Sequence, residues 1–205
     1  MWLTIAVTTL LALCNGCGGS NGTSGPPPVT TLTAAQATAV ATQLEGTFVA
    51  ASALMGSGLC PTPPSYSPGA EDYCAISVAT SVPCSDGGLA AISGLLTGDV
   101  SFTDTGTFTG PLTLTPTSCS IPGSALVFNG YPNLTVSGAI NFFYGEVTSF
   151  AVTEAGSISY GPKSTEVCPV NLTIAASFVG NAEHTTKSCT LTGTACGQTI
   201  NQSCM

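Results

Sequence analysis

Three segments of this chain alternate between apolar and polar residues, and this alternation restricts the fold more than any other feature. They cover residues 108–115, 134–142 and 170–178, and their polar positions are mostly Thr and Ser. A strand with one buried and one solvated face has this pattern, because successive side chains point to opposite sides. Thr suits such a pleated surface better than a helix. The chain is therefore predicted to be mainly β, as an antiparallel sheet or a partly closed barrel or sandwich.

Shorter runs of the same kind predict further strands. They cover residues 89–96, 125–128, 146–153, 157–160 and 188–196. Gly, Pro and Asn clusters separate most of these runs, and such clusters are typical of turns. The sequence therefore predicts many strands joined by short connections.

A helix is predicted before the sheet, over about residues 33–56. Thr33 and Gln36 have the spacing of a capping box, in which each side chain binds the backbone N–H of the other residue. The apolar residues that follow are three or four positions apart: Val40, Leu44, Phe48, Ala51 and Met55. They form one stripe of an amphipathic helix, which we expect to pack on the apolar face of the sheet.

Charged residues are scarce and mostly acidic. The 205 residues include ten acids and two basic residues, which gives a formal net charge of −8. Nucleic-acid binding depends on Lys and Arg that displace counterions from phosphates, so this class of function is excluded. A basic patch for anionic lipid headgroups is excluded for the same reason.

Ten cysteines in a chain of this size indicate an oxidising compartment and disulfides. Eight cysteines in the domain allow 105 connectivities, and the predicted turns favour one of them. Its pairs are Cys60–Cys74, Cys84–Cys119, Cys168–Cys196 and Cys189–Cys204. No metal or cofactor is predicted, because the one Cys-x2-Cys pair is Cys14–Cys17 and the chain has a single histidine.

The N-terminal segment determines the expected location of the protein. Residues 2–13 form an apolar run of signal-peptide length. It ends in Leu11-Ala12-Leu13-Cys14-Asn15-Gly16-Cys17, which resembles the lipobox of bacterial lipoproteins. This resemblance implies acylation of a cysteine, for example with palmitate, and anchoring of the protein to a membrane through its N-terminal acyl chains.

Two cysteines compete for acylation. Cys17 follows the small Gly16, as the lipobox requires, whereas Cys14 follows the bulky Leu13. Removal of Cys14 and acylation of Cys17 leave eight of the ten cysteines, an even number for pairing. We therefore expect Cys17 to carry the lipid, with Cys14 as the alternative.

The same argument divides the chain into three parts. Residues 1–16 are expected to be a signal peptide, residues 17–31 a flexible Gly/Ser/Pro tether, and residues 32–205 a single domain. The expected location is the cell envelope, at the outer membrane on its periplasmic or outward face. The alternative is a secreted protein without a lipid.

Candidate catalytic residues are few. A serine or cysteine hydrolase needs a base, and the single histidine, His184, lies in a polar stretch that we interpret as a solvated loop. A glycosidase needs two carboxylates across a sugar, and Glu146, Glu154 and Glu166 lie on or beside predicted strands. We interpret these acids as surface residues and predict no enzymatic activity.

Two patterns suit a binding role. The odd-numbered threonines from Thr103 to Thr115 would form a hydroxyl face, although Thr is also a common strand residue without any such role. A candidate contact patch consists of the aromatic residues around one turn, Phe142, Phe143, Tyr144 and Phe150. Consecutive aromatics place a ring on each face of a strand, so one ring is expected to point away from the core.

These observations together predict a lipid-anchored envelope protein with a non-catalytic structural or binding role. Its expected partner, beside the membrane, is a protein or a polysaccharide. A carboxylate-dependent hydrolase of surface polymers is one alternative. A carrier that encloses an apolar ligand between sheet and helix is another.

Overall fold

The computed structural model describes residues 32–55, 72–100, 105–143, 146–161, 166–179 and 185–204. These residues form one helix and ten strands, and the strands make a single antiparallel sheet. The elements are α1 (Ala34–Met55), β1 (Asp72–Pro83), β2 (Leu89–Val100), β3 (Thr105–Thr109), β4 (Leu112–Thr117), β5 (Cys119–Ser120), β6 (Val127–Phe143), β7 (Glu146–Tyr160), β8 (Glu166–Val179), β9 (Thr185–Ala195) and β10 (Gln198–Ser203). The predicted mainly β fold is confirmed. No helix in this part of the chain is long and apolar enough to cross a membrane.

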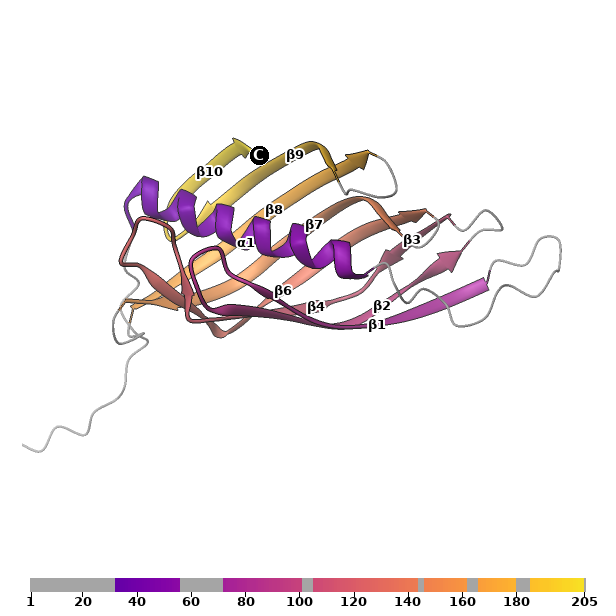
Figure 1. Cartoon of the computed structure of the whole chain (residues 1–205), viewed down its shortest axis with the longest axis horizontal. Helices are drawn as coiled ribbons and strands as arrows, with labels where there is room; N and C mark the ends of the chain where they lie inside the picture. The colour runs from indigo at the N-terminus through magenta and orange to yellow at the C-terminus, as the bar shows by residue number, and fades with distance from the viewer. Residues whose placement is uncertain are drawn as a thin grey trace, which may run out of the picture.

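Most strands pair with their neighbours in sequence (Figure 1). The order is β1-β2-β3-β6-β7-β8-β9-β10, with β4 beside β2 and β6, and β5 beside β6. β3 and β4 lie between the same two strands, because the strand predicted around residues 108–115 is interrupted at Gly110-Pro111. Proline has no N–H to donate to a ladder, and pairing resumes at Leu112.

The strand predictions missed β1 and divided both β6, predicted as 125–128 and 134–142, and β7. β1 was not predicted, although its apolar residues alternate and are buried: Cys74, Ile76, Val78 and Val82. β7 runs without interruption through the residues predicted as two strands, over 146–153 and 157–160. Gly156 lies inside β7 and keeps its pairing with Leu134 and Val170, so this glycine does not end the strand.

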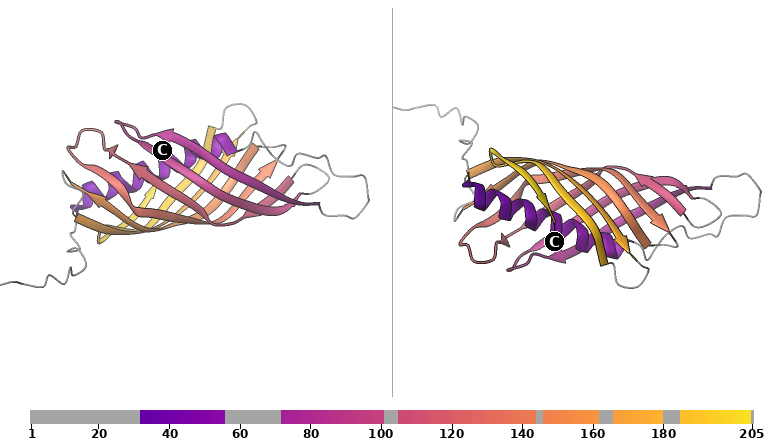
Figure 2. Two further views of the ribbon diagram at one scale, coloured as in Figure 1. Left: turned by 90° about the horizontal axis from the view of Figure 1, so that it is seen from below. Right: turned by 90° about the horizontal axis from the view of Figure 1, so that it is seen from above.

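α1 lies inside the curve of the sheet and fills the gap between its two edge strands (Figures 1 and 2). The edges are β1 and β10, and α1 contacts both of them as well as β7 and β9. The sheet is thus a partly closed barrel that the helix completes. Helix and sheet share one continuous apolar core.

The capping box at the start of α1 is formed as predicted. The Gln36 N–H donates to Thr33 Oγ1 at 3.3 Å, and the Thr33 N–H donates to Gln36 Oε1 at 3.1 Å. The predicted apolar stripe is buried. The buried surface of α1 is wider than this stripe, since it also includes Gln43, Glu45, Thr47 and Ser52. The cause is the position of α1 in the gap, where it meets strands on both sides.

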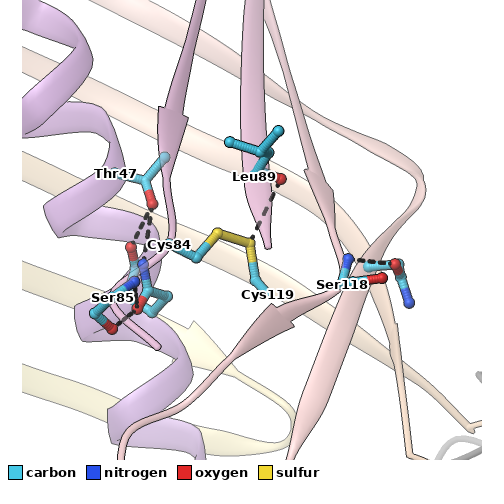
Figure 3. Close-up of a disulfide and its surroundings, with 8 residues drawn as sticks. Thr47, Cys84, Ser85, Leu89, Ser118 and Cys119 are labelled. Carbon is cyan, nitrogen blue, oxygen red and sulfur yellow. Dashed lines mark hydrogen bonds between the residues drawn. A yellow bond between two sulfur atoms is a disulfide. The ribbon is translucent and has the colours of Figure 1, made fainter. Parts of the chain in front are cut away.

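Three disulfides join parts of the sheet, and they are predicted pairs: Cys84–Cys119, Cys168–Cys196 and Cys189–Cys204. The first links the end of β1 to β5 beside the start of β2 (Figure 3). Cys74 is also disulfide-bonded. Its predicted partner Cys60 lies outside the described residues, as do Cys14 and Cys17.

Candidate functional site

A hollow of about 660 Å³ lies at one end of the sheet, over the ends of β2, β3, β6 and β7. Its lining residues are Asp99, Val100, Thr105, Gly106, Thr107, Asn141, Phe142, Phe143 and Thr148. A hollow of this volume is within the range of small-molecule sites. Most of the polar lining residues are on the outer face of the sheet, because they alternate with the buried core residues Phe108, Ile140 and Phe142.

The strand register places Asn141, one of the lining residues, between two neighbours that carry hydroxyl groups. Asn141 pairs with Thr107 on β3 and with Ser149 on β7. Thr107 Oγ1 donates to Asn141 Oδ1 at 2.7 Å, and Asn141 Nδ2 donates to Ser149 Oγ at 2.9 Å. Both ends of the amide are therefore held in one orientation.

A β-bulge adds a hydroxyl to the same place. Phe142 pairs with Val147 while Asn141 pairs with Ser149, so Thr148 is an extra residue in β7. Its Oγ1 donates to the Asn141 carbonyl oxygen at 3.2 Å. Bulges are frequent beside functional sites, because they change the direction of a side chain without ending the strand.

A row of small polar side chains extends from the hollow across five strands. We call Thr107, Asn141, Ser149, Ser177 and Ser188 the polar row; each is the register partner of the next. Ser177 Oγ and Ser188 Oγ are 2.7 Å apart and share a hydrogen bond. None of these five side chains is buried. At about 4.8 Å between strands, the row is about 19 Å long.

The predicted hydroxyl face on one strand is partly present. Its described members from Thr105 to Thr115 are partly or fully exposed, and Thr103 lies outside the described residues. Side-chain hydrogen bonds, however, connect hydroxyls on different strands, as in the polar row and between Thr153 and Thr173. The register of the sheet, which the sequence did not predict, determines these connections.

The aromatic contact patch needs correction. Phe142 and Phe150 are 2% exposed and belong to the core, where their rings meet Phe108 and Phe48 edge to face at 5.1 and 5.0 Å. Phe143 is 36% exposed and lines the hollow. Alternation along β6 places Phe142 and Phe143 on opposite faces, so the four residues cannot form one patch. Tyr144 lies outside the described residues.

The three strand acids do not come together. Glu146 and Glu154 are eight positions apart on β7, about 26 Å at 3.3 Å per residue. Glu166 pairs with Tyr160 at the other end of β7. Glycosidase carboxylates lie about 5–10 Å apart, so this trio does not have the required geometry. His184 lies outside the described residues.

Glu154 is not the surface acid that the sequence predicted. Its side chain is 0% exposed on the inner face of β7, and its register partners are Val136 and Leu172. Neither carboxyl oxygen has a hydrogen-bond partner among the described residues. Burial raises the pKa of Glu154 to about 8, and the charge of Glu45 adds to the rise.

Glu45 comes to the same interior from the inward side of α1. Burial raises its pKa to about 7, and its side chain is 6% exposed. Glu45 Oε1 lies 3.6 Å from Cys189 Sγ. This sulfur is in the disulfide with Cys204 and has no hydrogen to donate, so the contact does not satisfy the carboxyl group. For the same reason the group of Glu45, Cys189 and Cys204 is not a set of metal ligands in this oxidised form.

Sequence patterns could have identified both buried acids. On its strand Glu154 is two or four positions from the buried residues Phe150, Val152 and Ile158, so it lies on the same face as they do. Glu45 is four positions after Ala41 and three before Phe48, which is the spacing of one helix face. We call Glu45 and Glu154 the carboxyl pair.

The carboxyl pair and the hollow differ in chemistry. The hollow has hydroxyl groups, a fixed amide, the Asp99 carboxyl group and one exposed aromatic ring, which together suit a neutral, hydroxyl-rich ligand. The carboxyl pair lies in the core, where a substrate in solution has no direct contact with it.

Comparisons with protein-family models, with curated proteins and with solved structures give no match for this chain.

Proposed function

We propose that this protein is a lipid-anchored envelope protein whose β domain is a non-catalytic binding module. The hollow and the polar row are its ligand site. The observation that carries this proposal is an uncharged row of solvent-accessible hydrogen-bonding side chains that begins in the hollow lined by Phe143 and crosses five strands.

The location of the site fits an N-terminal anchor. The Leu32 carbonyl oxygen accepts a hydrogen bond from Gln198 Nε2 at 3.0 Å, which fixes the start of α1 beside the start of β10. The hollow lies at the other end of the sheet, where β2, β3 and β6 reach it (Figure 1). A lipid at Cys17 would hold the end with Leu32 toward the membrane, so the hollow would face away from it.

A neutral saccharide chain is the ligand class that this surface fits best. Sugar hydroxyls can exchange hydrogen bonds with Asn141 and the row hydroxyls, and the C–H face of a pyranose ring can stack on Phe143. The net charge of −8 disfavours polyanionic partners. The length of the row, about 19 Å, suits a polymer rather than a single sugar.

The alternative of a carboxylate-dependent hydrolase has less support from the geometry. Asp99 is the one carboxyl group among the described residues that line the hollow. The alternative of an apolar carrier would use the interior, which is lined by core residues of both helix and sheet.

The anchor is tested by the intact mass of the protein extracted from its native membrane, before and after reduction. We expect the mass of residues 17–205 plus acyl chains, and a gain of eight hydrogens on reduction, since eight cysteines remain for pairing. A product without lipid would contradict the anchor and place the protein in the secreted class. An odd number of free thiols would contradict the choice of Cys17.

The ligand site is tested by NMR titration with maltohexaose, cellohexaose and chitohexaose. We expect shifts of the backbone amides along the polar row with at least one probe, and about tenfold weaker binding by Phe143→Ala and Asn141→Ala. Thr153→Val is the matched control, because Thr153 is in a hydroxyl pair on the outer face outside the row. Shifts elsewhere, or none with any probe, would contradict the saccharide site. New reducing ends in the mixture would favour the hydrolase.

A further inference from the structure

The carboxyl pair is unusual for its surroundings. Glu154 has no exposed surface and no hydrogen-bond partner among the described residues, in a core that is otherwise mostly apolar. The charge of Glu45 contributes to the raised pKa of Glu154, and the two elements that carry these residues are in contact. One belongs to the helix and the other to the sheet, so the pair spans the contact between α1 and β7.

The other elements around the pair provide no compensating charge. β6 and β8 present Val136 and Leu172 beside Glu154, and β9 presents Leu191 and the Cys189–Cys204 disulfide. On β10 the buried residue is Ile200. On β1 the buried side chains that the structure describes are apolar. Tyr160, at the end of β7, is the other buried titratable side chain of that strand. No basic residue is buried in the described part of the chain.

α1 is attached to the domain less firmly than the strands are attached to one another. The helix contains no cysteine, and the three described disulfides all join parts of the sheet. Among the described residues, three side-chain contacts with hydrogen bonds hold α1 and the residues before it against β10 and the residues after β1. Gln198 donates to the Leu32 carbonyl, Gln202 Nε2 donates to Thr42 Oγ1 at 2.8 Å, and Gln43 Oε1 accepts from Ser85 (Figure 3).

Ionisation of the pair would act on this contact. A carboxylate in an apolar core loses its hydration, and two carboxylates close together also repel each other. Water can relieve this cost by entering between α1 and the sheet, which breaks few hydrogen bonds and no described disulfide. The ladders and disulfides keep the sheet folded while the helix moves.

We propose that Glu45 and Glu154 form a protonation-controlled closure, in which α1 fills the gap between β1 and β10 while both carboxyls are neutral and leaves it when they ionise. The open form exposes the apolar core of the curled sheet at the gap. The closure is a property of the interior and does not depend on the saccharide site.

The direction of the pH dependence follows from the raised pKa values. Glu45, with a pKa of about 7, and Glu154, with a pKa of about 8, are both neutral at pH 6 and both ionised at pH 9. The first charge makes removal of the second proton harder, so the two protons are lost over a broad range. The closed form is therefore favoured at pH 6, and opening increases from about pH 7 upward.

Hydrogen exchange followed by mass spectrometry at pH 6 and pH 9, corrected for the intrinsic exchange rate, tests this closure in the full domain. We expect protection of α1 to fall at least about tenfold between these pH values, while β6, β7 and β8 change less than about threefold. The variant with Glu45→Gln and Glu154→Gln is expected to lose this difference. Glu146→Gln is the matched control, because it removes a partly exposed acid at the end of the same strand.

A second measurement does not depend on the folding of any variant. Nile red fluorescence with the wild-type protein is expected to rise between pH 6 and pH 9, because the open form exposes apolar surface. Equal loss of protection in α1 and in the sheet would show global unfolding and overturn the closure. Unchanged protection of α1, or a pH response that survives in the double variant, would overturn it as well.

Discussion

The helix and the sheet of this protein contribute to the same core but are stabilised in different ways. The sheet is held by continuous ladders and by disulfides, and the buried side chains of its inner face are apolar apart from Glu154 and the Tyr160 hydroxyl. α1 has neither ladder nor disulfide, and it contributes four of the described buried polar side chains: Gln43, Glu45, Thr47 and Ser52. The sheet is therefore expected to behave as a rigid frame, and α1 as an element whose attachment depends on conditions.

One glycine in the sheet and one in the helix show the same difference between these two parts of the protein. A Cβ added to Gly138, in β6, would lie 2.2 Å from the Ala151 carbonyl oxygen, and Gly138 has a φ of +148°. A Cβ added to Gly46, in α1, would meet nothing within 4 Å. The strands approach closely at a position that only glycine can occupy, whereas the helix glycine has no such role.

The largest effect is expected from Gly138→Ala. The new methyl group would also lie 2.6 Å from Val152 Cα, and neither backbone can move away without breaking the ladder. We expect a loss of about 3 kcal/mol or more in the free energy of unfolding. Urea denaturation at pH 6 measures this loss. A variant as stable as the wild type would show that β6 and β7 do not approach each other so closely.

The next effect concerns the disulfides of the sheet. Replacing Cys168 and Cys196 with Ala opens a bridge across 28 residues. In the chain-entropy model this costs about 3–4 kcal/mol, because the unfolded chain regains the freedom that the bridge removed. The midpoint of urea denaturation measures it. A loss under about 1 kcal/mol would mean that the ladders alone hold β8 and β9 in place.

Glu154→Met is expected to stabilise the protein. The folded protein holds the Glu154 proton up to a pKa of about 8, against 4.5 for the unfolded chain. The raised pKa of Glu154 therefore makes its full contribution to the free energy of unfolding below about pH 4.5. This contribution is lost as the pH rises through 8. The variant should be more stable than the wild type at pH 8 by on the order of 3 kcal/mol, since Met fills a similar volume without a charge.

Thermal unfolding between pH 5 and pH 9 measures this difference. The wild type should lose stability toward pH 9, and the slope should be smaller in Glu154→Met. Glu146→Gln should keep the slope of the wild type. If Glu154→Met is less stable than the wild type at every pH, Glu154 has a partner that stabilises its charge.

The smallest effect is expected from Gly46→Ala, which tests the helix side of the comparison. Alanine restricts the unfolded chain and favours the helix, and the exposed site has room for its methyl group. We expect a gain of about 0.5–1 kcal/mol by urea denaturation at pH 6. A destabilising effect would mean that α1 is packed as tightly as the strands.

Features that depend on nearby residues could be predicted well. The capping box of Thr33 and Gln36, the apolar stripe of α1 and the alternation in β6 and β8 follow from local geometry. The three described disulfides also followed, because each closes a short series of turns whose register can be estimated. β1 was not predicted because the residues before it in the sequence are rich in Pro, Ser and Gly, a composition typical of turns.

Features that depend on distant residues were predicted poorly. The sequence interpretation placed Glu154 on the surface because acids are rarely buried, and it placed four aromatics in one patch because they are close in sequence. The candidate site was found only in part. Phe143, Thr105 and Thr107 were named beforehand, but Asn141, Thr148 and the row to Ser188 come from strand register.

The sequence by itself determined the fold class, the position of the helix in the chain and the described cysteine pairs, because these depend on periodicity and on short separations. Only the tertiary structure decided which side chains meet. Curling of the sheet brings the two edge strands to the same helix, and this places Glu45 of α1 near Glu154 of β7. Register across five strands aligns the polar row. Burial and contact between distant residues depend on what covers them, and alternation along one strand carries no information about that.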